Sequence, residues 1–202
     1  MSPQIRNKKI MPNVVRGFTL IEMMVSVGIF ALITTLIMVS GRSFGGSVLL
    51  TNLAYDVALS VRRAQTFGIN VRADQGAVNP FDSGYGVRFR TDTPTEFLFY
   101  ADRDGNQLIT SGANPSEILE TYTIGQGNRV AKACATISSV EYCSDSSSLV
   151  AVNTFFKRPD PDATIITNLG TASSAVITVT SAKGESREIH VESTGQISIQ
   201  KP

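Results

Sequence analysis

The chain has 202 residues, enough for one domain of ordinary size together with an anchor segment. Its formal net charge is +1, so bulk electrostatics does not favour nucleic acid as a partner. The charge is unevenly distributed: residues 1–17 carry four basic and no acidic side chains, whereas the sequence from Arg42 onward carries 14 basic and 16 acidic ones. Basic residues directly before an apolar stretch form the positive-inside pattern, which predicts a cytoplasmic amino terminus and export of the remainder.

An apolar run of 22 residues extends from Phe18 to Val39 and contains one charged side chain, Glu22. As a helix it would be about 33 Å long, enough to cross a bilayer core. It is longer than the roughly 7–15 apolar residues of a secretory signal peptide. Two alternatives stay open: a signal peptide cleaved near residues 40–47, or a plain anchor in which Glu22 reaches water at the cytoplasmic face. A charge at the bilayer centre costs about 3 kcal/mol on insertion scales, so such residues usually face a partner.

The residues around the start of this run, RGFTLIEMMVSV at 16–27, closely resemble the prepilin signal shared by type IV pilins and type II secretion pseudopilins. The resemblance implies cleavage between Gly17 and Phe18 by a prepilin peptidase/methyltransferase, followed by N-methylation of Phe18. It also implies that Glu22, the fifth residue of the mature chain, serves assembly. In a filament its carboxylate can lie beside the Phe18 amine of a neighbouring subunit, where pairing compensates both charges at low dielectric constant. Met11 is an alternative start to Met1, with a leader of residues 11–17 instead of 1–17.

After the apolar run, hydrophobic side chains recur every three to four residues, which indicates an amphipathic helix. They are Val48, Leu49, Leu53, Val57, Val61 and Ala64. We therefore expect a leader at 1–17, a transmembrane helix at 18–40, an amphipathic continuation at 41–69 and an exported β-rich domain at 70–202. Gly41, Gly45 and Gly46 predict a kink or a locally melted turn in this helix.

A second pattern, just after the apolar run, is typical of hydrolases. Residues 41–45, GRSFG, match G-x-S-x-G, but that motif requires a strand before it and a helix after it. The only histidine, His190, alternates with Ile189 and Val191, which places it on the solvated face of a predicted strand. A membrane-anchored hydrolase is therefore a weak alternative, and no enzyme is expected.

From residue 84 onward the apolar period changes to two, which predicts strands. We expect them at 85–90, 96–100, 108–110, 118–124, 149–156, 175–181, 187–192 and 196–200, with loops at 70–83 and 157–162. The last three should form an antiparallel meander, with turns at 183–184 and 194–195. One long helix followed by many short strands predicts an α+β fold, in which a long amino-terminal helix packs on an antiparallel β-sheet domain, as in pilins.

This layout, with the closing strand STGQISI at 193–199, resembles H-type minor pseudopilins and the FimT-like minor pilins. The resemblance implies a minor pseudopilin, a structural subunit of the pilus-like filament with which a type II secretion system exports proteins. The alternative is a minor type IV pilin for pilus assembly, adhesion or DNA uptake. Partners would be other pilin or pseudopilin subunits, the prepilin peptidase, an inner-membrane assembly platform and, before assembly, membrane lipid.

The implied location is the inner membrane, crossed once, with a cytoplasmic amino terminus and the carboxy-terminal domain in the periplasm or outside the cell. No nucleic acid partner is expected, because the local basic residues are few and are best explained as solvated faces. They are Arg62, Arg63, Arg88 and Arg90.

Two further patterns concern the predicted β-rich domain. Asp102, Asp104 and Asn106 offer oxygen ligands at alternate positions, as in calcium loops, and Glu117 could supplement them. The pattern departs from an EF-hand, so an Asp-Gly hairpin turn is the simpler interpretation and no metal or cofactor is assigned beyond this calcium candidate. Cys134 and Cys143 lie in a serine-rich exported region and are expected to form a disulfide, since zinc would need more ligands.

Overall fold

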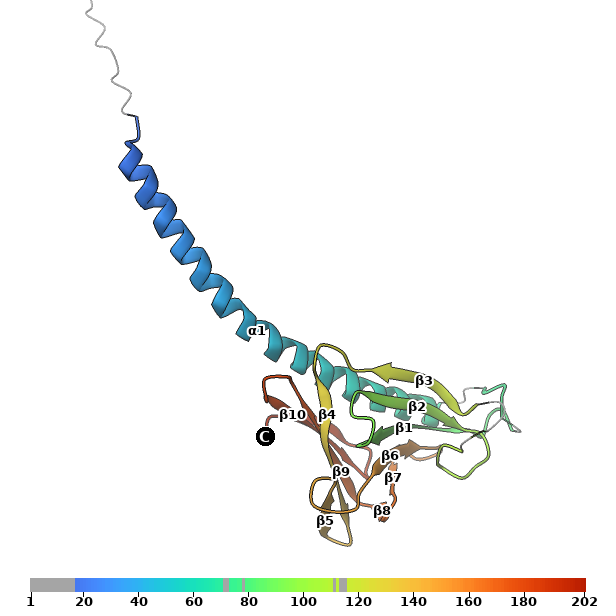
Figure 1. Ribbon diagram of the computed structural model, residues 1–202. Coiled ribbons are helices and arrows are strands. Elements are labelled where there is room, and N and C mark those ends of the chain that lie inside the picture. Colours follow the sequence, from blue (N-terminus) through green and yellow to red (C-terminus); the bar gives the residue numbers. More distant parts are fainter. Residues whose placement is uncertain (1–16, 71–72, 78, 111, 113–115) are drawn as a thin grey trace, which may run out of the picture. The chain divides into compact units, whose positions relative to one another are not determined.

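The structure, a computed structural model, describes residues 17–70, 73–77, 79–110, 112 and 116–202. Helix α1 (Leu20–Ile69) comes first, and all the strands of the described chain follow it (Figure 1). The chain divides into two compact units, which meet between Ser43 and Phe44. We call them the amino-terminal unit and the carboxy-terminal unit and describe each by itself.

The amino-terminal unit contains a helical segment suited to a bilayer. Residues Leu20–Met38 have a mean hydropathy of 2.2, and none of this segment is buried within the protein. The hydroxyl groups of Ser26, Thr34 and Thr35 donate to carbonyl oxygens four residues earlier, at 2.7–2.8 Å. Because hydrocarbon offers no hydrogen-bond partners, these internal bonds make the polar side chains compatible with a membrane.

The carboxy-terminal unit contains two antiparallel sheets. The first has the order β3-β2-β1-β6-β7-β8. Its strands are β1 (Gly84–Arg90), β2 (Glu96–Asp102), β3 (Ile118–Thr123), β6 (Ala151–Phe156), β7 (Ala163–Thr167) and β8 (Gly170–Ala172). The second has the order β11-β10-β9-β4-β5. Its strands are β4 (Arg129–Ile137), β5 (Val140–Cys143), β9 (Ser174–Thr180), β10 (Ser186–Glu192) and β11 (Ile197–Gln200).

The part of α1 in this unit packs against both sheets. Its buried face follows a helical spacing of three and four residues and consists of Leu50, Ala54, Val57, Val61 and Ala64, all with no exposed surface. Arg63 Nη1 donates to a Glu120 carboxylate oxygen and to the Tyr122 hydroxyl on β3, at 2.7 Å each. On the other sheet, Arg62 Nη2 donates to the Ile197 carbonyl of β11 at 3.2 Å. The helix therefore joins the edge strands of the two sheets.

The end of α1 depends on a close approach that requires glycine. A Cβ atom at Gly68 would lie 2.4 Å from the carbonyl oxygen of Phe156, a backbone atom that cannot move aside easily. The Gly68 carbonyl accepts a hydrogen bond from the Arg158 N–H at 3.0 Å. This contact fixes the helix end against the end of β6.

The predicted α+β fold, with an antiparallel β-sheet domain packed on a long amino-terminal helix, is confirmed. Strands β4, β5, β7 and β8 were not predicted, and two further details of the prediction were wrong. The expected melted turn is not found, because α1 continues through Gly41, Gly45 and Gly46; glycine costs a helix only about 1 kcal/mol per residue. The alternative, a kink at these glycines, stays a prediction. Residues 108–110 are not a strand, because the N–H groups of Leu108 and Thr110 donate to the side chains of Asn106 and Glu117.

Candidate functional site

The predicted processing site lies at the start of α1. Because the helix begins at Leu20, Thr19 is its N-cap residue and Glu22 is the third helical residue. The Glu22 N–H donates to Thr19 Oγ1 at 3.3 Å, and the Met23 N–H donates to the Thr19 carbonyl at 3.1 Å. Thr-x-x-Glu is the sequence of a capping box, so the same two residues that belong to the motif also define where the helix starts.

The bond between Gly17 and Phe18 lies just before this cap. Residues 17–19 have no regular structure and are exposed, and 75% of the Phe18 surface is accessible. A Cβ at Gly17 would meet nothing within 4 Å. An exposed, non-helical bond next to a capped helix is well suited to a peptidase, because the enzyme can bind extended backbone without first unwinding the helix.

Glu22 is exposed in the first turn of α1. A negative side chain is favourable there, because the unpaired N–H groups of a helix start carry partial positive charge. The start of the helix therefore stabilises a carboxylate at this position. In a membrane the charge would also need a cation, and the nearest acidic or basic residues in the sequence are Arg16 and Arg42.

Residues 12–38 match the family model described as the prokaryotic N-terminal methylation motif. The amino-terminal segment thus carries a prepilin signal of the type IV pilin and pseudopilin kind, and the match supports a type IV pilin-like protein. No curated protein and no solved structure gives a significant match. The motif ends at Met38, so the strands of the carboxy-terminal unit lie outside it.

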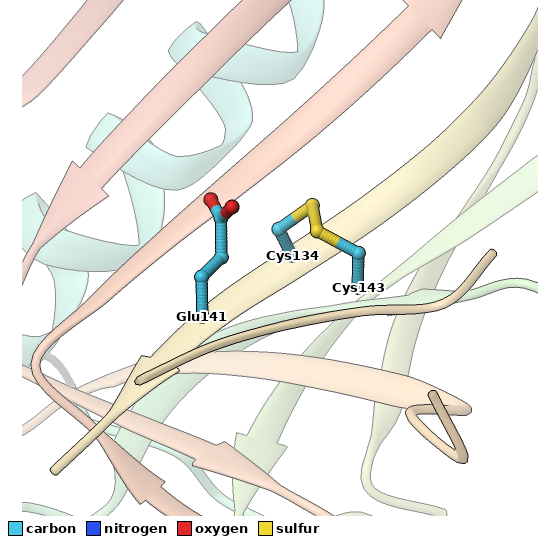
Figure 2. Close-up of side chains that lie close together, drawn as sticks. All are labelled: Cys134, Glu141 and Cys143. Atoms are coloured by element: carbon cyan, nitrogen blue, oxygen red, sulfur yellow. A yellow bond between two sulfur atoms is a disulfide. The ribbon is translucent and has the colours of Figure 1, made fainter. Parts of the chain in front are cut away.

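The two cysteines lie opposite each other on neighbouring strands. Cys134 of β4 is the register partner of Cys143 of β5, and their sulfur atoms form a disulfide (Figure 2). Glu141 lies beside them on β5. Because both sulfur atoms are used in the disulfide, this group presents no thiolate to a metal ion.

The calcium candidate forms a compact acidic cluster after β2. Asp102, Asp104 and Glu117 each place a carboxylate oxygen within 4.8 Å of the others. Burial raises the pKa of Asp102, whereas a hydrogen bond from the Thr110 hydroxyl lowers the pKa of Asp104. Asn106 was also predicted as a ligand, but its side chain is hydrogen-bonded to Asp104 and to the Leu108 N–H.

Most oxygen atoms in this cluster already accept hydrogen bonds. Glu117, only 1% exposed, accepts from the N–H groups of Arg103 at 3.0 Å and Thr110 at 2.7 Å. Asp102 accepts from the Gly105 N–H at 2.8 Å. The cluster therefore holds the loop in shape by itself, and calcium binding stays a prediction.

The hydrolase pattern lacks the backbone that it requires. Residues 41–45 lie within α1, so no strand leads into Ser43. His190, on β10, is half-buried, and its Nε2 lies 3.3 Å from a Glu188 carboxylate oxygen. Neither feature has the geometry of a nucleophile elbow.

The outward face of α1 in the carboxy-terminal unit was not predicted as a functional surface. Val48, Tyr55 and Leu59 are 44%, 62% and 65% exposed, and their spacing of seven and four residues places them on one line opposite the buried face. An outward helix face usually carries polar side chains. Val48 and Leu49 were predicted as part of the buried apolar stripe, and this was wrong: they are 44% and 37% exposed, because the buried face follows the line from Leu50 to Ala64.

Proposed function

We propose that the protein is a minor pseudopilin, a structural subunit of the pilus-like filament of a type II secretion system. The prepilin motif at residues 12–38 is the observation that carries this proposal. Cleavage occurs between Gly17 and Phe18, and Phe18 is then N-methylated. Residues 18–40 anchor the subunit in the inner membrane, residues 41–69 continue as an amphipathic helix, and residues 70–202 form the exported domain.

Glu22 sets the register of the subunit in the filament. Once the leader is removed, the amine of Phe18 is a cation at the edge of an apolar helix. A buried ion pair contributes little net stability, but leaving one partner unpaired costs several kcal/mol, about 3–5 by mutational data. A subunit that is displaced along its neighbour loses the ion pair between Glu22 and the Phe18 amine and leaves both charges unpaired. The cost of the unpaired charges therefore favours the correct position.

The exposed Val48, Tyr55 and Leu59 extend the possible contact beyond the membrane segment. Apolar side chains on an outward helix face favour contact with another protein surface. In this proposal they face neighbouring pilin or pseudopilin subunits.

The role of Glu22 is tested with Glu22→Ala, expressed with the other components of the secretion filament. We expect the variant to insert into the membrane and to lose its leader normally, but to be depleted at least tenfold from sheared filaments. Thr34→Ala is the matched control, since Thr34 lies in the same exposed segment and bonds only within its own helix. Normal incorporation of Glu22→Ala would contradict the proposal.

A second test separates secretion from pilus function. The same motif occurs in minor type IV pilins, some of which take up DNA. Retention of DNA by the detergent-solubilised chain at physiological salt would replace the present proposal with that alternative. We expect no retention, because the carboxy-terminal unit carries 13 basic and 16 acidic side chains.

A further inference from the structure

Four basic residues from distant parts of the sequence lie at the same end of the second sheet. Arg129 begins β4 and is paired with Thr180 at the end of β9, which in turn is paired with Ser186 at the start of β10. A Cβ at Gly127 would lie 3.0 Å from the Ala182 side chain, so the turn before β4 lies against the turn that contains Lys183. The strand register therefore brings Arg129 and Lys183 to the same end.

The other two basic residues are Arg187 and Lys201. The pairing of Glu188 with Gln200 places Arg187 and Lys201 next to each other at the end of the β10–β11 ladder. Together with Ser47 and Glu185 they line an open hollow of about 440 Å³. The carboxy terminus and the turn between β9 and β10 lie side by side in Figure 1. We call the set Arg129, Lys183, Arg187 and Lys201 the basic end.

The basic end differs in charge from the rest of its unit. In segments 126–129, 181–187 and 201–202, Glu185 is the only acidic side chain, so the side chains of this end sum to +3, and the terminal carboxylate of Pro202 reduces the formal charge to +2. Glu188, one residue further along β10, lies 3.3 Å from His190. The side chains of the whole carboxy-terminal unit, 13 basic and 16 acidic, sum to −3, which leaves −6 for its remainder.

The basic end is also close along the chain to the apolar span. A Cβ at Gly46 would lie 3.7 Å from Cδ of Lys183. Gly46 follows Met38, the last residue of the span, by eight residues. Eight residues extend about 12 Å as a helix and no more than about 28 Å in any conformation. Lipid headgroups add about 5–7 Å beyond the hydrocarbon, and charges act over about 8 Å at physiological salt.

We infer that the basic end docks on anionic phospholipid headgroups of the leaflet from which the span emerges. Arginine and lysine are the side chains that bind phosphate, and clusters of them next to a membrane segment attract anionic lipid. The acidic remainder of the unit is repelled by the same surface. An unassembled subunit is thus held with the basic end toward the membrane, before a filament takes it up. The inference depends on the anchoring part of the proposed function but not on assembly.

The test uses the full chain, one copy per nanodisc, and measures acetylation rates of individual lysines by mass spectrometry. The discs contain either phosphatidylcholine alone or phosphatidylcholine with 30 mol% phosphatidylglycerol. An anionic surface at about −30 to −50 mV raises the local proton concentration roughly three- to sevenfold, which slows acetylation of lysines within a Debye length by the same factor. We expect that slowing at Lys183 and Lys201, and its loss in 0.5 M NaCl.

Lys157 is the internal control. Arg158, the next residue, bonds to Gly68, which is 22 residues beyond Gly46 and about 33 Å further along α1. The rate at Lys157 should be the same in both kinds of disc. Equal rates at Lys183 and Lys201 in both discs, or equal slowing at Lys157, would overturn the inference.

Variants and an added anion distinguish lipid headgroups from free phosphate as the bound group. Arg187→Gln with Lys201→Gln should reduce the slowing of acetylation at Lys183. Lys132→Gln with Arg158→Gln removes the same charge elsewhere and should leave that slowing unchanged.

Slowing of acetylation at Lys183 and Lys201 by 20 mM inorganic phosphate in phosphatidylcholine discs would show a site for free anions and overturn the assignment to lipid. If the chain does not stay in the discs, the anchoring part of the proposed function is wrong, and this inference is wrong as well. Stable insertion with no dependence on lipid charge would overturn this inference alone.

Discussion

Thr19 and Glu22 show how two residues can satisfy helix chemistry and a processing signal together. Thr19 accepts the Glu22 N–H and ends the irregular segment that contains Gly17 and Phe18. The cap thus fixes the boundary between the bond that we propose is cut and the helix that follows it. Capping explains a carboxylate in the first helical turn, and the cost of a charge in an apolar segment is the argument for the proposed additional role of Glu22 in assembly.

The disulfide makes a prediction at the scale of two residues. Replacing Cys134 and Cys143 with serine should lower the free energy of unfolding by about 2–3 kcal/mol, because a closed loop of ten residues restricts the unfolded chain. Denaturant unfolding of the carboxy-terminal unit within the full chain measures the loss. The reduced natural chain should show the same loss, and alkylation of native protein should label neither cysteine. Two reactive thiols before reduction would contradict the pairing.

The Arg63–Glu120 pair makes a prediction about pH. The guanidinium of Arg63, hydrogen-bonded to Glu120, lowers the pKa of that carboxyl. A lowered pKa in the folded state means that the pair stabilises above the ordinary glutamate pKa of about 4.3, and that this contribution is lost as the pH falls through the lower folded value. Both side chains are more than 40% exposed, so the contribution at pH 7 is small, about 0.5 kcal/mol.

The measurement compares the natural chain with Glu120→Gln. The difference in free energy of unfolding should be present at pH 7 and absent at pH 3. Glu141→Gln on the exposed part of β5 is the control and should change little at either pH. A difference that grows on acidification would contradict the assigned sign.

At the scale of elements, the loop after β2 provides a test of calcium. If Asp102, Asp104 and Glu117 bind the ion, 5 mM calcium should raise the midpoint of thermal unfolding by a few degrees relative to a chelator, as expected for a dissociation constant of about 0.1–1 mM. Asp104→Asn should abolish the shift, whereas Asp92→Asn, which removes an exposed carboxylate paired with Arg90, should retain it. An unchanged midpoint would end the calcium interpretation.

Alternation predicts most of the strands, although β6 is buried at every position and β3 is mostly exposed. Strands β1, β2, β3, β6, β9, β10 and β11 were expected close to their observed bounds. Strand β4 was not, because its register shifts between Val130 and Lys132 and its buried positions include small alanines, so the period of two is broken. Strand β8 has only three residues, and its position is set by pairing with β7.

The candidate sites also differ in whether their residues are neighbours in the sequence or are brought together only by the fold. The prepilin signal is contiguous, so it could be recognised from the sequence alone. The basic end could not, because Arg129 and Lys201 are 72 residues apart and come to the same end of the sheet only through the register of four strands. Glu117 lies between these two cases. The sequence suggests it as a calcium ligand, but only the path of the chain after β2 brings its carboxylate close to Asp102.

At the scale of the whole molecule, the two units carry separate parts of the function. The amino-terminal unit holds the prepilin signal, the proposed cut site and the apolar span, and the carboxy-terminal unit holds the sheets, the disulfide and the basic end. A signal that acts before the span leaves the anchor on the mature chain. Cleavage after the span would instead release a soluble domain. The position of the cut therefore decides what kind of protein this is.

The most direct test is the mass of the amino-terminal peptide after co-expression with a prepilin peptidase. We predict a mature chain that begins with N-methyl-Phe18, and an intact leader in Gly17→Phe, since a side chain at the exposed Gly17 changes only what the peptidase binds. Gly28→Ala, equally free of contacts, should be processed normally. An uncut natural chain, or a cut near residues 40–47, would contradict the account.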